Sequence, residues 1–177
     1  MYYKSGSTNE TIKADMVLVS DFKLFVNWEL SIDLKVKGPA NVWSCILAVR
    51  KKGVQFGQYG SRVPSLVLTP HGQLEVSASF SGIWNWYWNN PRTSFETWFN
   101  LKLRHNQEGK FQIYIDHVLN VEYVNGIPQE WENMEVILGD TFSADETTNA
   151  EYRNLLYQGF PFLDELQFPD ESKLTQN

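Results

Sequence analysis

The chain has 177 residues, which fits one domain, and it carries a formal net charge of −6 at pH 7. An acidic protein of this kind disfavours nucleic acid or an anionic membrane as its main partner. No run of about 18 apolar residues occurs, so the sequence predicts no membrane insertion. Aromatic residues make up 15% of the chain, enough to build a core rich in flat side chains.

Alternation of apolar and polar residues dominates the chain, and this pattern is typical of half-buried β-strands. The clearest example is Trp28 to Val36, which ends at Gly38-Pro39. Further strands are predicted at 42–50, 65–68, 74–80, 98–105, 111–115, 118–124, 135–138 and 152–156. Because the strands are short and no long amphipathic helix is evident, the sequence predicts an all-β fold, a single antiparallel β-sandwich of the jelly-roll type.

The ends of the chain differ from its middle. Residues 1–15 are polar and are expected to form a flexible N-terminal segment, while 16–160 form the sandwich. Residues 161–177 mix phenylalanine, leucine, proline and acids, and they are expected either to pack on the domain or to be disordered. Cys45 is the only cysteine, so no internal disulfide can form, and its apolar strand predicts a buried, inert thiol.

Several segments, in this order, match the strands of a known group of domains. They are 27–35, 43–47, 62–68, 98–103, 109–116, 125–136 and 152–155. Trp43-Ser44-Cys45-Ile46-Leu47 and Arg62-Val63-Pro64-Ser65-Leu66 are examples. Together these segments resemble the laminin-G-like (LamG, pentraxin-like) domains of the concanavalin-A-like lectin and glucanase superfamily.

This resemblance implies an extracellular or cell-surface module that binds glycans or proteins, often with calcium at a rim of loops. The chain departs from the group because it lacks a disulfide pair and has Ser61 before Arg62, where relatives commonly have Asp. The glucanase branch needs closely spaced carboxylates, whereas Glu29 and Asp33 are separated by Ser31 along their strand. The sequence therefore predicts a binding module and no enzyme.

One loop contains oxygen ligands suited to a hard cation. Asp140, Asp145 and Glu146 are candidate metal ligands, and Asn149 lies nearby. Calcium is bound by carboxylates and carbonyl oxygens of this kind. The alternative is that these acids are simply hydrated on an acidic protein.

The segment Trp84 to Asn90 is the candidate ligand-binding site. In a strand, Trp84, Trp86 and Trp88 would share one face. Aromatic rings stack on the apolar faces of sugars, and amides bind their hydroxyl groups. With Asn89 and Arg92, the tryptophans therefore predict a glycan-binding rim, unless the three indoles fill the core.

The sequence thus predicts a noncatalytic module that recognises a glycan or glycoprotein. The alternative is an adhesion, protein-interaction or self-assembly module. In that case the same aromatic residues and the C-terminal tail would form the interface of a homo-oligomer or of a complex with another protein.

Overall fold

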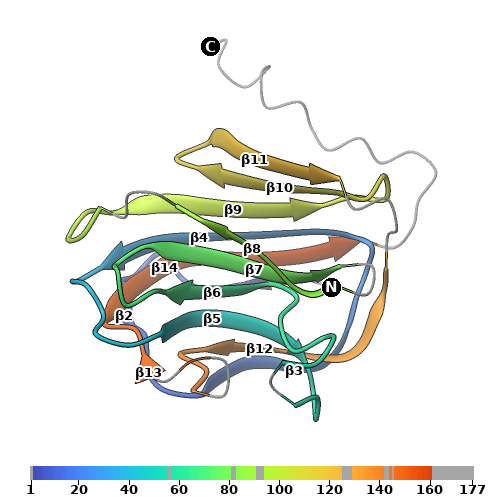
Figure 1. Ribbon diagram of the computed structural model, residues 1–177, viewed down its shortest axis with the longest axis horizontal. Coiled ribbons are helices and arrows are strands. Elements are labelled where there is room, and N and C mark those ends of the chain that lie inside the picture. The colour runs from blue at the N-terminus through green and yellow to red at the C-terminus, as the bar shows by residue number, and fades with distance from the viewer. Residues whose placement is uncertain are drawn as a thin grey trace.

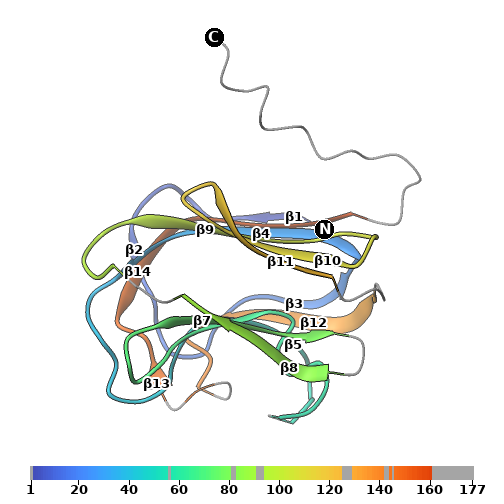
Figure 2. The same cartoon turned by 45° about the horizontal axis from the view of Figure 1, so that its top comes forward.

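The computed structural model describes residues 2–55, 57–80, 83–90, 94–124, 129–141, 144 and 146–160. In these ranges the chain forms strands β1 to β14 and no helix. No helix in them is therefore long and apolar enough to cross a membrane. The strands pack as two sheets, one on the other (Figures 1 and 2).

Sheet A has the strand order β1-β14-β4-β9-β10-β11, and β2 also pairs with β14. All of its pairs are antiparallel. In this order its strands are Tyr2–Lys4 (β1), Ala150–Phe160 (β14), Asn27–Val36 (β4), Phe99–His105 (β9), Lys110–Ile115 (β10), Val118–Val124 (β11) and Glu10–Thr11 (β2).

Sheet B has the strand order β3-β12-β5-β6-β7-β8, and its neighbours on this path are also antiparallel. The short strand β13 pairs with β5 in the parallel direction. The strands are Met16–Leu24 (β3), Trp131–Leu138 (β12), Ser44–Lys51 (β5), Ser65–Leu68 (β6), Leu74–Phe80 (β7), Ile83–Asn89 (β8) and Glu146–Thr147 (β13).

The core lies between the two sheets and is built from alternate residues of each strand. In β4, every second side chain from Trp28 to Val36 is buried, as the sequence pattern predicts. Where β8 approaches β11, aromatic rings close the gap between the layers. The ring of Phe80 lies 4.9 Å from that of Phe111 and 5.6 Å from that of Tyr123.

The predicted all-β antiparallel sandwich is therefore confirmed. The structure differs from the expectation for residues 1–15, because β1 and β2 pair with β14 and extend sheet A. Strand β3 was not predicted, since its exposed Val17 and the left-handed backbone at Asp21 interrupt the alternation. Residues 161–177 lie outside the described residues.

Candidate functional site

Strand β8, which contains the predicted tryptophans, is the edge strand of sheet B. Trp86 and Trp88 are partly buried and pack against the core. The Trp86 ring lies 5.0 Å from Tyr123, 5.5 Å from Phe111 and 5.7 Å from Phe80. These two indoles therefore help to close the sandwich.

Trp84 has a different environment because the pairing of β7 with β8 is irregular. Trp86 lies opposite Ala78, yet two positions further along β7 the partner is Ile83, so β8 holds one extra residue here. Trp84 is 41% exposed, and its ring centre lies 6.0 Å from the guanidinium carbon of Arg62. The single face predicted for the three tryptophans therefore does not include Trp84.

The remaining polar residues of β8 face away from the core, next to polar residues of β7. Asn89 lies opposite Glu75, and Tyr87 lies opposite Ser77. Directly opposed residues of antiparallel strands share a face and lie about 5 Å apart. We call this area the β7–β8 surface and define it by the residues Arg62, Glu75, Ser77, Trp84, Asn85, Tyr87 and Asn89.

Within the described residues, the β7–β8 surface contains one buried acceptor that lacks a donor, Asn89 Oδ1, beside the carboxylate of Glu75. The side chain of Glu75 is only 5% exposed and interacts with the charge of Arg62, without a hydrogen bond of its carboxylate in the described part of the chain. Leaving a buried polar atom unsatisfied costs about 1–3 kcal/mol, so such atoms in a folded protein require an explanation.

The charges of this surface come from Glu75 and Arg62. Burial raises the pKa of Glu75, and the positive charge of Arg62 opposes that rise. Burial lowers the pKa of Arg62, and the charge of Glu75 opposes that change. Arg62 Nη1 donates a hydrogen bond to Asn85 Oδ1 over 2.7 Å, which orients the Asn85 amide.

Exposed aromatic side chains lie beside these polar groups. Tyr87 is 57% exposed, and Trp84 flanks Arg62. The surface can therefore accept hydrogen bonds from several ligand hydrogens while a ring covers an apolar part of the ligand. The alternation of the sequence could have predicted that Glu75 and Tyr87 lie on this face. It could not have predicted that Arg62, which lies in the loop before β6, also belongs to it. Arg92 lies outside the described residues.

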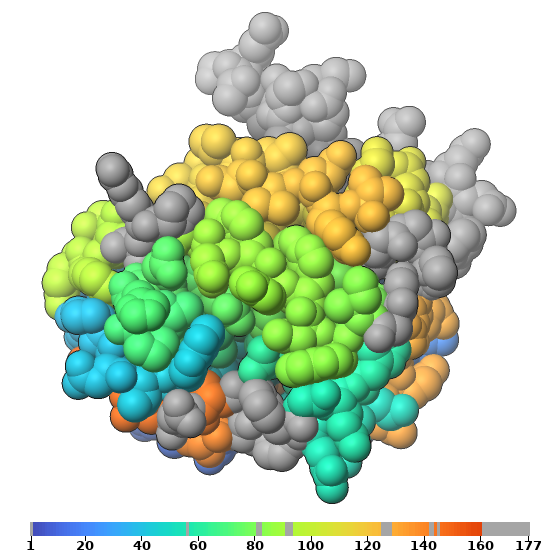
Figure 3. Space-filling model, viewed as in Figure 1, coloured from blue at the N-terminus to red at the C-terminus, as the bar shows by residue number. Residues whose placement is uncertain are grey.

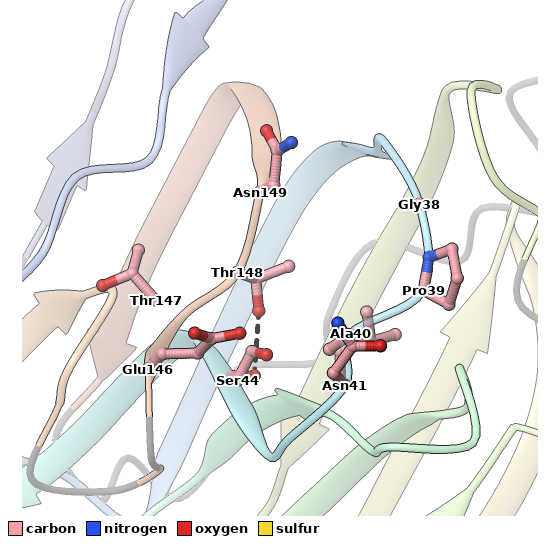
Figure 4. Close-up of a pocket in the computed structure, with 10 residues that line it drawn as sticks. Gly38, Pro39, Ala40, Asn41, Ser44, Glu146, Thr147, Thr148 and Asn149 are labelled. Atoms are coloured by element: carbon pink, nitrogen blue, oxygen red, sulfur yellow. Dashed lines mark hydrogen bonds between the residues drawn. The ribbon is translucent and has the colours of Figure 1, made fainter.

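A pocket lies at one end of sheet B (Figure 4). It has a volume of about 300 Å³ and lies between the 38–41 loop and the 146–149 segment. Ser44 and Leu68 line the pocket together with Glu146, which contributes a carboxylate to its wall.

The predicted metal ligands have separate surroundings in the described residues. Asp140 is 1% exposed, and its Oδ2 lies 3.6 Å from Arg50 Nε. Glu146 lines the pocket, and Asp145 lies outside the described residues. Within the described ranges, no group of three or more His, Cys, Asp or Glu residues could hold a metal ion. The described residues therefore do not assemble a calcium site, and calcium binding stays a prediction from the sequence.

No family model and no curated protein matches this chain. Solved structures do match in fold. The receptor-binding domain of botulinum neurotoxin D is 14% identical with a TM-score of 0.57, covering 89% of this chain and 46% of that one. The serotype D ligand-binding domain in complex with N-acetylneuraminic acid is 13% identical with a TM-score of 0.57, covering 89% and 44%.

A Trypanosoma rangeli sialidase is also similar in fold, at 9% identity and a TM-score of 0.57. The match covers 77% of this chain and 21% of the sialidase. The chain thus spans less than half the length of each of these proteins. At these identities the comparison supports the β-sandwich fold, and the position of any site must come from the residues of this chain.

Proposed function

We propose that this chain is a noncatalytic carbohydrate-recognition domain that binds a glycan on the β7–β8 surface. The observation that carries the proposal is the buried Asn89 Oδ1, which has no hydrogen-bond partner in the described part of the chain and lies on the residue opposite Glu75. Sugar hydroxyl groups are donors that could bond to both this oxygen and the Glu75 carboxylate. Such bonds to an ionised carboxylate are also stronger than bonds between neutral groups.

The aromatic residues of the surface supply the second half of sugar recognition. Tyr87 is exposed directly beside these acceptors and can stack on the C–H face of a pyranose ring. Trp84 and Asn89 of the sequence prediction remain in this site. Trp86 and Trp88 act in it indirectly, by holding β8 on the core. Arg92 stays a predicted contact.

The structural comparison is compatible with this proposal. One protein of similar fold was solved in complex with N-acetylneuraminic acid, and another is a sialidase. The proposal includes membership of the concanavalin-A-like, laminin-G-like group and an extracellular or cell-surface location, both of which rest on the sequence resemblance.

A glycan array tests the proposal with matched variants. Wild type is expected to bind a related set of glycans, and Tyr87→Ala and Glu75→Gln are expected to weaken that binding at least tenfold. The control is Tyr2→Ala, which removes a 65% exposed tyrosine from β1 in the other sheet and should bind as wild type. Circular dichroism confirms that each variant is folded.

Two results would contradict the assignment. If both variants bind glycans as well as wild type does, the site lies elsewhere on the molecule. If wild type binds no glycan on the array, the proposed function is wrong. Running the array in calcium and again in EDTA tests the predicted role of calcium separately, because only a calcium-dependent site loses binding in EDTA.

Self-association is a second candidate function, favoured by the exposed apolar residues of two adjacent edge strands. Side chains of β8 and β11 meet on the face shown in Figure 3, and the contact of Trp86 with Tyr123 joins the two strands. The exposed apolar residues on these edges include Ile83, Val118, Leu119 and Val124. Unprotected edges of this kind pair readily with other strands. Light scattering should then show a mass that rises with concentration, and Val124→Lys should lower it.

A further inference from the structure

We infer that the pocket at the end of sheet B is a second binding site, and that it takes one neutral sugar unit or a neutral polyol of similar size. This inference stands independently of the β7–β8 surface, because it rests on different residues and on a separate cavity.

Three side chains around the pocket are available to a ligand. Glu146, Asn41 and Asn149 line it, and none of their side chains makes a hydrogen bond or ion pair in the described part of the chain. Glu146 comes from β13 and Asn41 from the loop after β4, so two distant segments contribute to the polar wall (Figure 4). A ligand can use these groups without breaking a contact within the protein.

The buried hydroxyl groups of the pocket can act only as acceptors toward a ligand. Thr148 Oγ1 donates its hydrogen to the Ser44 carbonyl oxygen over 2.8 Å. Ser44 Oγ donates its hydrogen to the Val42 carbonyl oxygen over 3.2 Å. Both oxygens keep lone pairs, and the Glu146 carboxylate adds more acceptor sites. The pocket is therefore rich in acceptors and fits a ligand with several hydroxyl donors.

Charge narrows the class of ligand further. Among the described residues that line the pocket there is no Lys, Arg or His, and Glu146 is the one charged residue. A carboxylate or phosphate ligand would be repelled by Glu146 without a cation to offset it. A single carboxylate is also too little for tight calcium binding, which takes six to eight oxygen ligands. Neutral hydroxyl groups are not repelled by Glu146, and they need no further carboxylates to bind.

The apolar part of the wall and the size of the pocket agree with a sugar ring. Pro39, Ala40 and Leu68 supply apolar surface for ring C–H groups. A volume of about 300 Å³ lies at the low end of the range for small-molecule pockets, about 300–1,000 Å³. The pocket therefore holds a single ring and excludes a longer chain from its interior.

The pocket is preformed, because backbone hydrogen bonds join its two sides. Lys37 N donates to the Asn149 carbonyl oxygen over 3.0 Å, and Glu146 N donates to the Trp43 carbonyl oxygen over 3.2 Å. A third bond runs from Thr148 N to the Cys45 carbonyl oxygen over 2.9 Å. A site that is already ordered loses less conformational entropy when the ligand binds.

The experiment is a titration of ¹⁵N-labelled protein with the methyl glycosides of glucose, galactose and mannose, followed by NMR. At least one is expected to shift the amide signals of residues 38–44 and 146–149 saturably, at millimolar concentration. Signals of residues 85–89 report on the β7–β8 surface in the same spectra. Failure of the pocket and failure of the proposed glycan function are therefore seen separately.

Variants and other probes sharpen the test. Glu146→Ala and Asn41→Ala should each weaken the pocket shifts at least fivefold. The control Glu132→Ala, which removes an exposed carboxylate on β12, should leave them unchanged. N-acetylneuraminic acid, an anion, should give no shifts at the pocket.

Three outcomes would overturn the inference. The first is that none of the three glycosides shifts residues 38–44 and 146–149. The second is that N-acetylneuraminic acid shifts them as strongly as a neutral glycoside does. The third is that calcium chloride alone shifts them at micromolar concentration, which would make the pocket a cation site.

Discussion

Two buried glutamates on the outer faces of the sandwich, Glu29 on sheet A and Glu75 on sheet B, differ in their partners. On sheet A, Arg104 Nε donates to Glu29 over 2.6 Å, and the Asp33 carboxylate accepts hydrogen bonds from Asn100 and Asn154. On sheet B, Glu75 is as deeply buried as Glu29, but in the described part of the chain its carboxylate accepts no hydrogen bond and only the charge of Arg62 interacts with it.

This difference separates a structural surface from a candidate binding surface. A buried carboxylate that is paired within the protein contributes to folding, and a ligand would have to displace its partner. A buried carboxylate without a donor costs stability in the free protein. That cost can be offset when a ligand supplies the donor, so polar groups of this kind are expected at binding sites.

The largest predicted effect is a difference in stability between variants on the two sides of β8. Trp86→Ala should lower the free energy of unfolding by about 3 kcal/mol, because the indole packs on three core aromatics. Tyr87→Ala should change it by less than about 0.5 kcal/mol, because the ring is exposed. Urea unfolding measures both. Equal losses would mean that Tyr87 is also structural.

The next largest effect is a difference in stability between variants that alter the surroundings of Glu29 and of Glu75. Arg104→Ala should cost about 2 kcal/mol of stability at pH 7, because it leaves the Glu29 carboxylate buried without its partner. Glu75→Gln should slightly raise the free energy of unfolding at pH 7, because it removes a buried charge. Urea unfolding at pH 7 measures both variants, and a clear loss in Glu75→Gln would show that sheet B also pairs this residue.

A smaller effect appears in the pH dependence of stability. Burial would raise the pKa of Asp33, but hydrogen bonds from Asn100, Asn154 and Arg153 outweigh it and lower the pKa. Asp33 therefore stabilises the fold above its unfolded-state pKa, and this contribution is lost as the pH falls through the folded-state value. The pKa of Glu75 is raised, so its effect has the opposite sign, with stability lost as the pH rises through the folded-state value.

Thermal unfolding between pH 3 and pH 7 measures how these contributions to stability change with pH. The range brackets the usual carboxyl pKa of about 4. The destabilisation by Asp33→Asn should shrink toward acid pH, and the stabilisation by Glu75→Gln should also shrink there. Glycan binding by wild type should weaken as acid protonates Glu75, with a midpoint above the ordinary glutamate pKa. A midpoint at or below that value would count against Glu75 as the acceptor.

The smallest effect concerns Cys45, on the outer face of sheet B. Its side chain is 0% exposed, and burial raises the pKa of its thiol. The folded protein should therefore react with a thiol reagent hundreds of times more slowly than the protein in denaturant. A fast reaction in the native state would show that this part of the sheet opens readily.

Much of the fold was predictable because strand alternation is a local property. The predicted ranges 65–68, 74–80 and 118–124 coincide with β6, β7 and β11. The same rule misplaced Trp84, because an extra residue in β8 depends on how β7 pairs with it. The flexible N-terminal segment was expected from its polarity alone, and its pairing with β14 could not be read from local sequence.

The sequence by itself determined most of the strands that build the core, which sides of those strands are apolar, and hence the β-sandwich. Only the tertiary structure decided which polar residues remain without hydrogen-bond partners. Glu29 and Glu75 occupy equivalent places in their strand patterns, and neither pattern indicates whether an arginine will reach the carboxylate. Pairing depends on neighbours that are distant in sequence, such as Arg104 for Glu29, and these meet only when the sheets form.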